Sequence, residues 1–208
     1  MIVYACKYTG QPWIEEAVAS ARSWMPEEPV LVVDSDSADI SYFQKVESLG
    51  ATVADAHNLH YETGAWWYAY DHSDSTYFFF LHDSTLLRQS LATFKALPVT
   101  VFGTLENWTG ADNHRGSIAS IAVSMSYTVT DPFWGVMGSM FGCQREVLDR
   151  LAPHRYLPTD KYEAECMERV WGMALMNVGV DVKACAWGPG ERLATAESPF
   201  YKFLSRRT

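Results

Sequence analysis

The chain has 208 residues, 48% of them hydrophobic, which is enough for one well-buried core and rather few for two. We therefore expect a single domain over residues 1–208. The formal net charge of −9 gives no general positive field, which disfavours nucleic-acid binding by bulk electrostatics. The N-terminal apolar run is too short for a signal peptide, and no run of about 18 apolar residues appears. These features predict a cytoplasmic protein with no membrane contact.

Short apolar runs alternate with amphipathic stretches through the first half of the chain. Continuous apolar runs of four or five residues are typical of strands buried on both faces of a parallel sheet. The predicted strands are residues 2–6, 30–33, 51–54, 77–81 and 99–102, and the predicted helices are residues 12–25, 39–49 and 63–70. This alternation predicts a doubly wound α/β arrangement.

The second half has a different pattern. Residues 105–116 form a polar stretch that predicts a loop, and the partial alternation of residues 118–130 predicts an added, less buried strand. Asp160 and Glu163 stand at capping-box spacing before the longest helix, which Gly179 ends. Beyond it we expect a strand over residues 180–187, then a closing loop and a short tail helix within residues 188–208.

Acidic residues follow two of the predicted strands. Asp34 and Asp36 come directly after residues 30–33, and His82, Asp83 and Ser84 follow residues 77–81. In an open α/β sheet, ligands gather beyond the carboxyl ends of the strands. Carboxylates there can accept hydrogen bonds from a base or ribose, and Asp83 with His82 offers ligands to a divalent ion that carries a diphosphate. The simpler alternative is that both segments cap helices, the second starting near residue 86.

Together, VLVVDSDSAD (residues 30–39) and YFFFLHDSTLL (residues 77–87) resemble the donor half of the GT-A glycosyltransferases, especially family 2. The resemblance implies one Rossmann-like domain with an open mixed sheet flanked by helices. Its donor half would be residues 1–104, and its acceptor half and tail residues 105–208. Asp34 would contact uracil or another base of a nucleotide sugar such as a UDP-sugar. His82-Asp83-Ser84 falls on the DxD motif, which holds Mn²⁺ or Mg²⁺ and the diphosphate, but only its middle position is acidic.

The resemblance extends to residues 136–151, which are similar to the acceptor-side strand and helix of that family. Gly138 and Ser139 would then let a sugar approach the backbone closely. An inverting transferase needs a carboxylate that removes the proton of the acceptor hydroxyl. In the family that the chain resembles, this carboxylate comes from an acidic pair at the start of a helix, which corresponds here to Glu163 and Glu165. We prefer Glu163 to Glu165 because Glu163 shares the core-facing stripe of that helix. Trp108, in the polar loop, is the aromatic residue that we expect to line an acceptor cleft.

The expected activity is therefore metal-assisted transfer of a sugar from a nucleoside-diphosphate donor to an acceptor hydroxyl, with inversion. The chain has neither GxGxxG nor a P-loop, which disfavours a Rossmann oxidoreductase and a P-loop NTPase. A sugar nucleotidyltransferase is disfavoured because only Lys7 and Gly10 remain of its basic, glycine-rich loop. A catalytically silent nucleotide-sugar-binding protein stays open. The acidic surface favours a small molecule, glycan or protein as acceptor and leaves a hydroxylated nucleic-acid base as a further alternative.

Overall fold

The computed structural model describes residues 1–106, 108, 112–129, 131–187 and 199–202. Its central element is a six-stranded sheet with the order β3-β2-β1-β4-β9-β6. The strands are β1 (Ile2–Cys6), β2 (Val30–Asp34), β3 (Thr52–Ala54), β4 (Tyr77–His82), β6 (Val99–Val101) and β9 (Phe141–Gln144). Strands β1 to β4 are parallel, whereas β9 runs antiparallel to both of its neighbours, β4 and β6. The expected open mixed sheet is confirmed.

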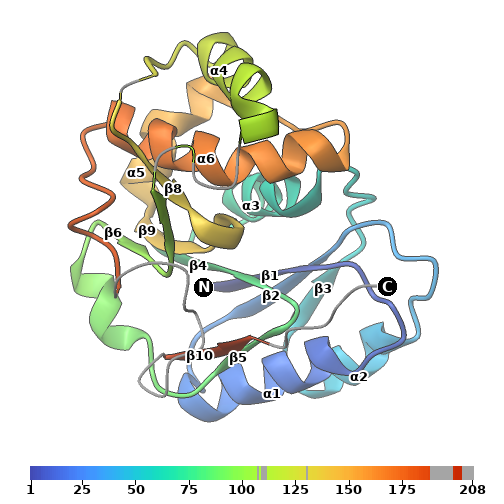
Figure 1. Ribbon diagram of the computed structural model, residues 1–208. Coiled ribbons are helices and arrows are strands. Elements are labelled where there is room, and N and C mark those ends of the chain that lie inside the picture. The colour runs from blue at the N-terminus through green and yellow to red at the C-terminus, as the bar shows by residue number, and fades with distance from the viewer. Residues whose placement is uncertain (107, 109–111, 130, 188–198, 203–208) are drawn as a thin grey trace.

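Helices cover both faces of this sheet (Figure 1). The helices α1 (Trp13–Trp24) and α2 (Tyr42–Ser48) lie on one face. The other face carries α3 (Tyr61–Asp71), α5 (Arg145–Leu151) and α6 (Lys161–Asn177), with α4 (Arg115–Ser124) packed on α6.

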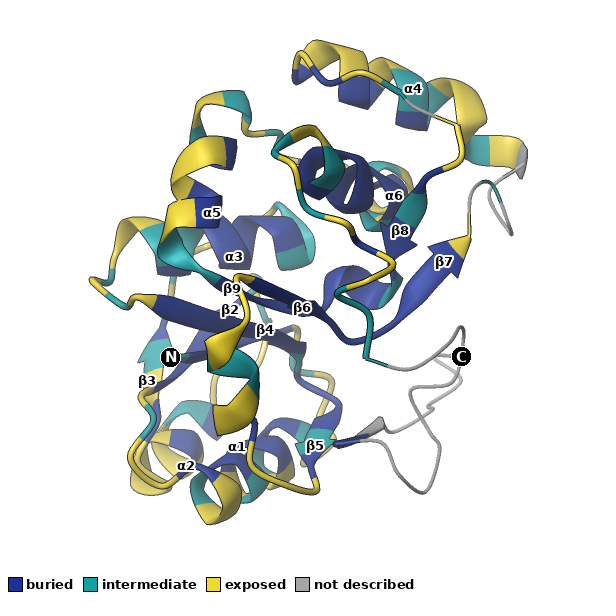
Figure 2. Cartoon of the chain, turned by 90° about the vertical axis from the view of Figure 1, so that its left-hand side faces the viewer, coloured by how far each residue is buried: buried dark blue, intermediate teal, exposed yellow. Residues whose placement is uncertain are grey.

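Alternate side chains of each central strand enter different cores. In β4, Phe79 and Leu81 face the α1 side, while Phe78 and Phe80 face the α3 side, and all four are fully buried. In Figure 2 the strand β4 is coloured as buried, between the helices of the two faces. This burial explains why the strands appear in the sequence as continuous apolar runs.

Two small antiparallel sheets complete the described structure. The strand β5 (Thr85–Leu87) pairs with β10 (Phe200–Lys202), and β7 (Thr104–Glu106) pairs with β8 (Trp134–Val136). Short 3₁₀ segments cover Ala92–Ala96, Asp112–His114, Met137–Ser139 and Ala152–His154. Within the described residues, no helix is long and apolar enough to span a bilayer.

Three expected elements are wrong, and a fourth lies mostly outside the described residues. Residues 118–129 do not form the expected strand, because Ile118, Ile121 and Ala122 are buried at helical spacing on α4, and residue 130 lies outside the described residues. Residues 180–187 form turns with one bridge between Ala186 and Val101. The helix expected near residue 86 is β5. The described part of the tail, residues 199–202, contains β10, and the rest of residues 188–208, where a closing loop and a short tail helix are expected, lies outside the described residues.

Candidate functional site

A cleft of about 320 Å³ lies at the carboxyl ends of the parallel strands. The backbone register pairs Cys6 with Asp34 and Ala5 with His82, so β1, β2 and β4 end at one level. The sheet order therefore brings together residues far apart in sequence, where α/β proteins bind ligands. We name it the strand-end cleft; it is lined by Ala5, Lys7, Ser35, Asn58, Leu59, Tyr61, Glu62, His82 and Asp83.

Asp83 presents an oriented carboxylate in the strand-end cleft. Its side chain is buried, and Oδ2 accepts a hydrogen bond of 3.3 Å from the backbone N–H of Lys7. The Lys7 ammonium donates to the backbone carbonyl of Asp36 at 2.9 Å. Beneath the cleft, burial and then the charge of Asp83 raise the pKa of Cys6 well above its ordinary value, so this thiol stays protonated.

Asp34 and Asp36 lie close to the cleft but do not line it. Asp34 is 1% exposed, and its two carboxylate oxygens accept hydrogen bonds from the Tyr42 hydroxyl at 2.7 Å and the Ser37 N–H at 2.8 Å. Asp36 is exposed and has a left-handed backbone with φ of 56°. Ser84 is buried and is also absent from the lining. Their roles in donor binding remain predictions.

A second, smaller cavity of about 140 Å³ adjoins the first. The two share Tyr61, Glu62 and His82, so we name the smaller one the side cavity. Its other lining residues are Gly138, Ser139, Lys161, Ala164, Glu165 and Glu168. The predicted acceptor residues Gly138 and Ser139, and the predicted base Glu165, thus meet next to the cleft that holds Asp83.

Glu163, the preferred base, lies elsewhere. It lines a groove of about 510 Å³ between α4 and α6, together with Ser120 and Tyr156. Its carboxylate accepts hydrogen bonds from the N–H and hydroxyl of Thr159, at 2.7 and 2.9 Å. Those hydrogen bonds, with one from Tyr156, lower the pKa of Glu163. Asp160 caps α6 by accepting from the Glu163 N–H, as its spacing predicts.

Trp108 packs against the core edge. Its ring contacts Phe133 edge-on at 4.9 Å between centroids, and the guanidinium of Arg115 lies 5.3 Å from its centroid. It lines neither the strand-end cleft nor the side cavity. Residues 107 and 109–111, which flank it, lie outside the described residues, and its role at an acceptor remains a prediction.

The strand-end cleft offers few side chains that could coordinate a divalent ion. No group of three or more His, Cys, Asp or Glu side chains among the described residues could hold a metal ion by itself. Asp83 supplies one carboxylate in the strand-end cleft. Mg²⁺ is commonly held by one or two carboxylates plus substrate phosphates, without an all-protein cage. Asp83 therefore fits an ion that enters with a diphosphate.

The architecture is similar to that of a solved synthase. Glucosyl-3-phosphoglycerate synthase from Mycobacterium tuberculosis superposes with a TM-score of 0.53 at 13% identity, covering 91% of this chain and 69% of that one. Its complex with uridine diphosphate gives 0.51 at 12% identity, with 91% and 68% coverage. This chain has a GT-A-like fold.

Other comparisons add less. CMP:2-keto-3-deoxy-manno-octonic acid synthetase in complex with CTP reaches a TM-score of 0.49 at 16% identity, with 89% of this chain and 94% of that one covered. No protein-family model matches the chain, and no curated protein sequence matches it.

Within this GT-A-like fold, five polar residues of the strand-end cleft escaped the sequence analysis: Lys7, Ser35, Asn58, Tyr61 and Glu62. The signal was available, because Lys7 follows β1, Ser35 follows β2, and the other three lie on the segment from β3 into α3. Applying the strand-end rule to β1 and β3 as well would have found four of them, whereas Ser35 lies between Asp34 and Asp36, which the rule already selects after β2.

Proposed function

We propose that this chain transfers a sugar from a nucleoside-diphosphate donor to an acceptor hydroxyl. The observation that carries the proposal is the shared wall between the strand-end cleft and the side cavity, made by Tyr61, Glu62 and His82. A transfer reaction requires two substrates held in contact. Two adjoining cavities at the ligand-binding edge of a GT-A-like sheet provide those two positions.

In this proposal the strand-end cleft takes the donor. The similar synthase from Mycobacterium tuberculosis is described in complex with UDP, and at 12% identity that likeness supports the fold and motivates the ligand. Asp83, the acidic position of a degenerate, family 2-like DxD motif, would hold Mn²⁺ or Mg²⁺ with the diphosphate. A bound ion neutralises charge on the departing diphosphate. Lys7, which also lines the strand-end cleft, would add a cation close to the phosphates.

Glu165 is the better of the two predicted bases. It lines the side cavity, whereas Glu163 lines the groove between α4 and α6. The hydrogen bonds of Glu163 also lower its pKa, which makes it a weaker proton acceptor. Glu165 instead contacts His114 at 3.8 Å and Lys161 at 3.6 Å, with half of its side chain exposed.

Binding is tested first, by melting temperature in the presence of nucleoside diphosphates and their sugars, with and without Mn²⁺. A ligand at 100 times its dissociation constant should raise the melting temperature by about 5–10 °C, because it binds only the folded state. Asp83→Asn should lose most of this shift. Wild-type protein that responds to no nucleotide would contradict the proposed function.

Turnover is tested next, by release of nucleoside diphosphate from the sugar nucleotide that binds. Glu165→Gln should lower the rate by about 10²- to 10⁴-fold, the usual contribution of a general base. Glu163→Gln is the matched control two residues away and should stay near the wild-type rate. If Glu163→Gln lowers the rate more than Glu165→Gln does, Glu163 is the base. If wild type and both variants bind a sugar nucleotide without turnover, the chain is a silent nucleotide-sugar-binding protein.

A further inference from the structure

His82 connects the strand-end cleft to the side cavity. Its ring is 14% exposed; Nε2 lies within hydrogen-bonding distance of the Gly138 carbonyl, and Nδ1 lies 3.5 Å from Oε1 of Glu62. Glu62 comes from the first turn of α3, and Gly138 from the 3₁₀ segment that follows β8. The imidazole, which lies at the end of β4, thus contacts both α3 and this 3₁₀ segment.

The segment that His82 contacts has an unusual backbone. Gly138 and Ser139 are both left-handed, with φ of 61° and 51°. This conformation is unfavourable for serine, so neighbouring contacts must hold it. We name these two residues the left-handed turn; they form part of the wall of the side cavity.

Three hydrogen bonds hold the left-handed turn. The N–H of Gly138 donates to Oε1 of Glu168 at 2.8 Å, and the Gly138 carbonyl faces Nε2 of His82. The Ser139 carbonyl accepts a hydrogen bond of 3.1 Å from the indole N–H of Trp66, which is fully buried. His82 therefore belongs to a set of contacts that determines where the wall of the side cavity lies.

Hydrogen-bond chemistry fixes the role of Nε2. A carbonyl oxygen only accepts, so Nε2 must carry the proton that it shares with Gly138. The other ring nitrogen, Nδ1, lies 3.5 Å from Oε1 of Glu62. A hydrogen bond from one ring N–H to a backbone carbonyl fixes both the tautomer and the orientation of an imidazole ring.

We propose that His82 is a positioning residue that holds the left-handed turn as the acceptor wall of the side cavity. The acceptor role of that wall rests on the proposed function; the contact between His82 and the turn does not. Asp83, the next residue, faces the strand-end cleft. The adjacent residues His82 and Asp83, at the end of β4, thus reach both cavities.

The test uses the Trp66 indole N–H as a reporter of the turn, observed by ¹H–¹⁵N NMR and assigned with Trp66→Phe. His82→Ala and His82→Asn remove the donor that reaches Gly138, because the asparagine amide is too short. His82→Gln keeps a donor near the Nε2 position. His57→Ala is the matched control, since His57 is exposed beside Asp36 and Asp55. Binding of UDP with Mn²⁺ is measured for each protein.

We expect His82→Ala and His82→Asn to shift the reporter and speed its exchange with solvent about tenfold or more, with His82→Gln close to wild type. UDP–Mn²⁺ affinity should fall at least tenfold in Asp83→Asn, whose reporter stays unshifted. The proposal is overturned if the reporter in His82→Ala is unchanged, whatever the effect of that variant on UDP–Mn²⁺ binding. If wild-type protein binds no UDP, the proposed function fails, and the reporter still decides the role of His82.

Discussion

Asp34 has the position of a ligand-binding carboxylate and the contacts of a structural one. It ends β2 at the edge where ligands bind, but it accepts hydrogen bonds from Tyr42 and Ser37 within its own segment. Burial, followed by interactions with Cys6 and Asp34, raises the pKa of Tyr42, which therefore donates to Asp34 throughout the ordinary pH range. The strand-end rule finds the residue, but sequence alone cannot tell which partner its oxygens take.

Asp34→Ala should lower the free energy of unfolding by about 2–3 kcal/mol, because two donors, one of them fully buried, lose their acceptor. Urea denaturation measures this loss. Asp36→Asn is the control, since Asp36 is exposed and asparagine tolerates its left-handed backbone, and it should change stability by less than about 0.5 kcal/mol. An Asp34→Ala protein of normal stability that no longer responds to nucleotide would instead support direct contact with a base.

At the scale of elements, the sequence predicts secondary structure best where an apolar pattern is compatible with only one kind of element. The strands around Val3, Val32 and Phe79 are buried on both faces and appear as continuous apolar runs. The segment around Ile121 was misread because alternating small and apolar residues fit a strand over short windows, although its buried residues follow helical spacing. Pairing across β9 depends on contacts distant in sequence, which no local pattern contains.

The contact between α6 and β8 is a second feature that the sequence does not reveal. A Cβ at Gly172 would lie 1.8 Å from the carbonyl oxygen of Trp134 and 2.8 Å from the Cα of Gly135. Both obstacles are backbone atoms of β8, so no side-chain rotation can relieve the overlap. Because β8 leads directly into the left-handed turn, this close approach also helps to place the wall of the side cavity.

Gly172→Ala should therefore destabilise the protein by about 1–3 kcal/mol, despite the higher helix propensity of alanine. Gly116→Ala is the control on α4, where a Cβ meets nothing within 4 Å, and it should be neutral or stabilising by up to about 1 kcal/mol. Chemical denaturation compares the two. Equal effects would mean that α6 and β8 separate without cost.

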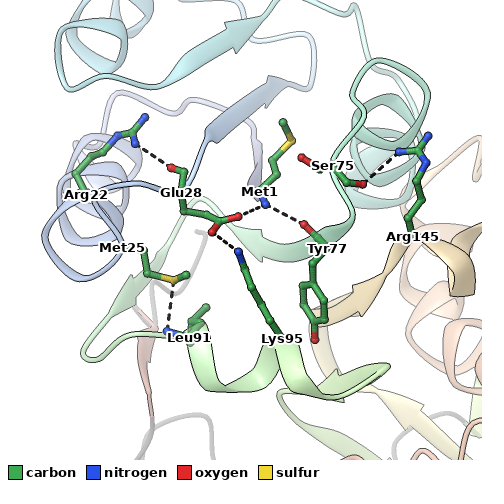
Figure 3. A network of polar contacts seen from close by, with 9 residues as sticks. All are labelled: Met1, Arg22, Met25, Glu28, Ser75, Tyr77, Leu91, Lys95 and Arg145. Carbon is green, nitrogen blue, oxygen red and sulfur yellow. Dashed lines mark hydrogen bonds and ion pairs between the residues drawn. The ribbon is translucent and has the colours of Figure 1, made fainter.

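At the scale of the whole molecule, one partly buried carboxylate, that of Glu28, links the start of the chain to the segments at the edge of the α1 face. Glu28, in the turn after α1, pairs with the amino group of Met1 and with Lys95, while its carbonyl accepts from Arg22 at 2.9 Å (Figure 3). The Met1 amino group also donates to the Tyr77 carbonyl at 2.8 Å. This network ties β1, β4 and the 3₁₀ segment Ala92–Ala96 together opposite the strand-end cleft.

Glu28 should make stability depend on acid pH. Burial alone would raise its pKa, but hydrogen bonds from Lys95 and the Met1 amino group outweigh burial and lower it below the ordinary 4.5. Above pH 4.5 the unfolded and folded chains are both ionised at this residue, and its stabilisation is complete. As the pH falls through the lowered folded value, the unfolded chain takes up the proton first and the stabilisation is lost.

The free energy of unfolding of wild type should therefore exceed that of Glu28→Gln by about 1–2 kcal/mol at pH 6, a modest value because Lys95 is 37% exposed. The difference should shrink as the pH falls below 4.5 and vanish once the folded carboxyl is protonated. Glu27→Gln removes the same charge from the neighbouring exposed residue and should show no such trend. A difference between wild type and Glu28→Gln that is constant from pH 6 to pH 3 would mean that the glutamine preserves the hydrogen bonds and that charge contributes nothing at this junction.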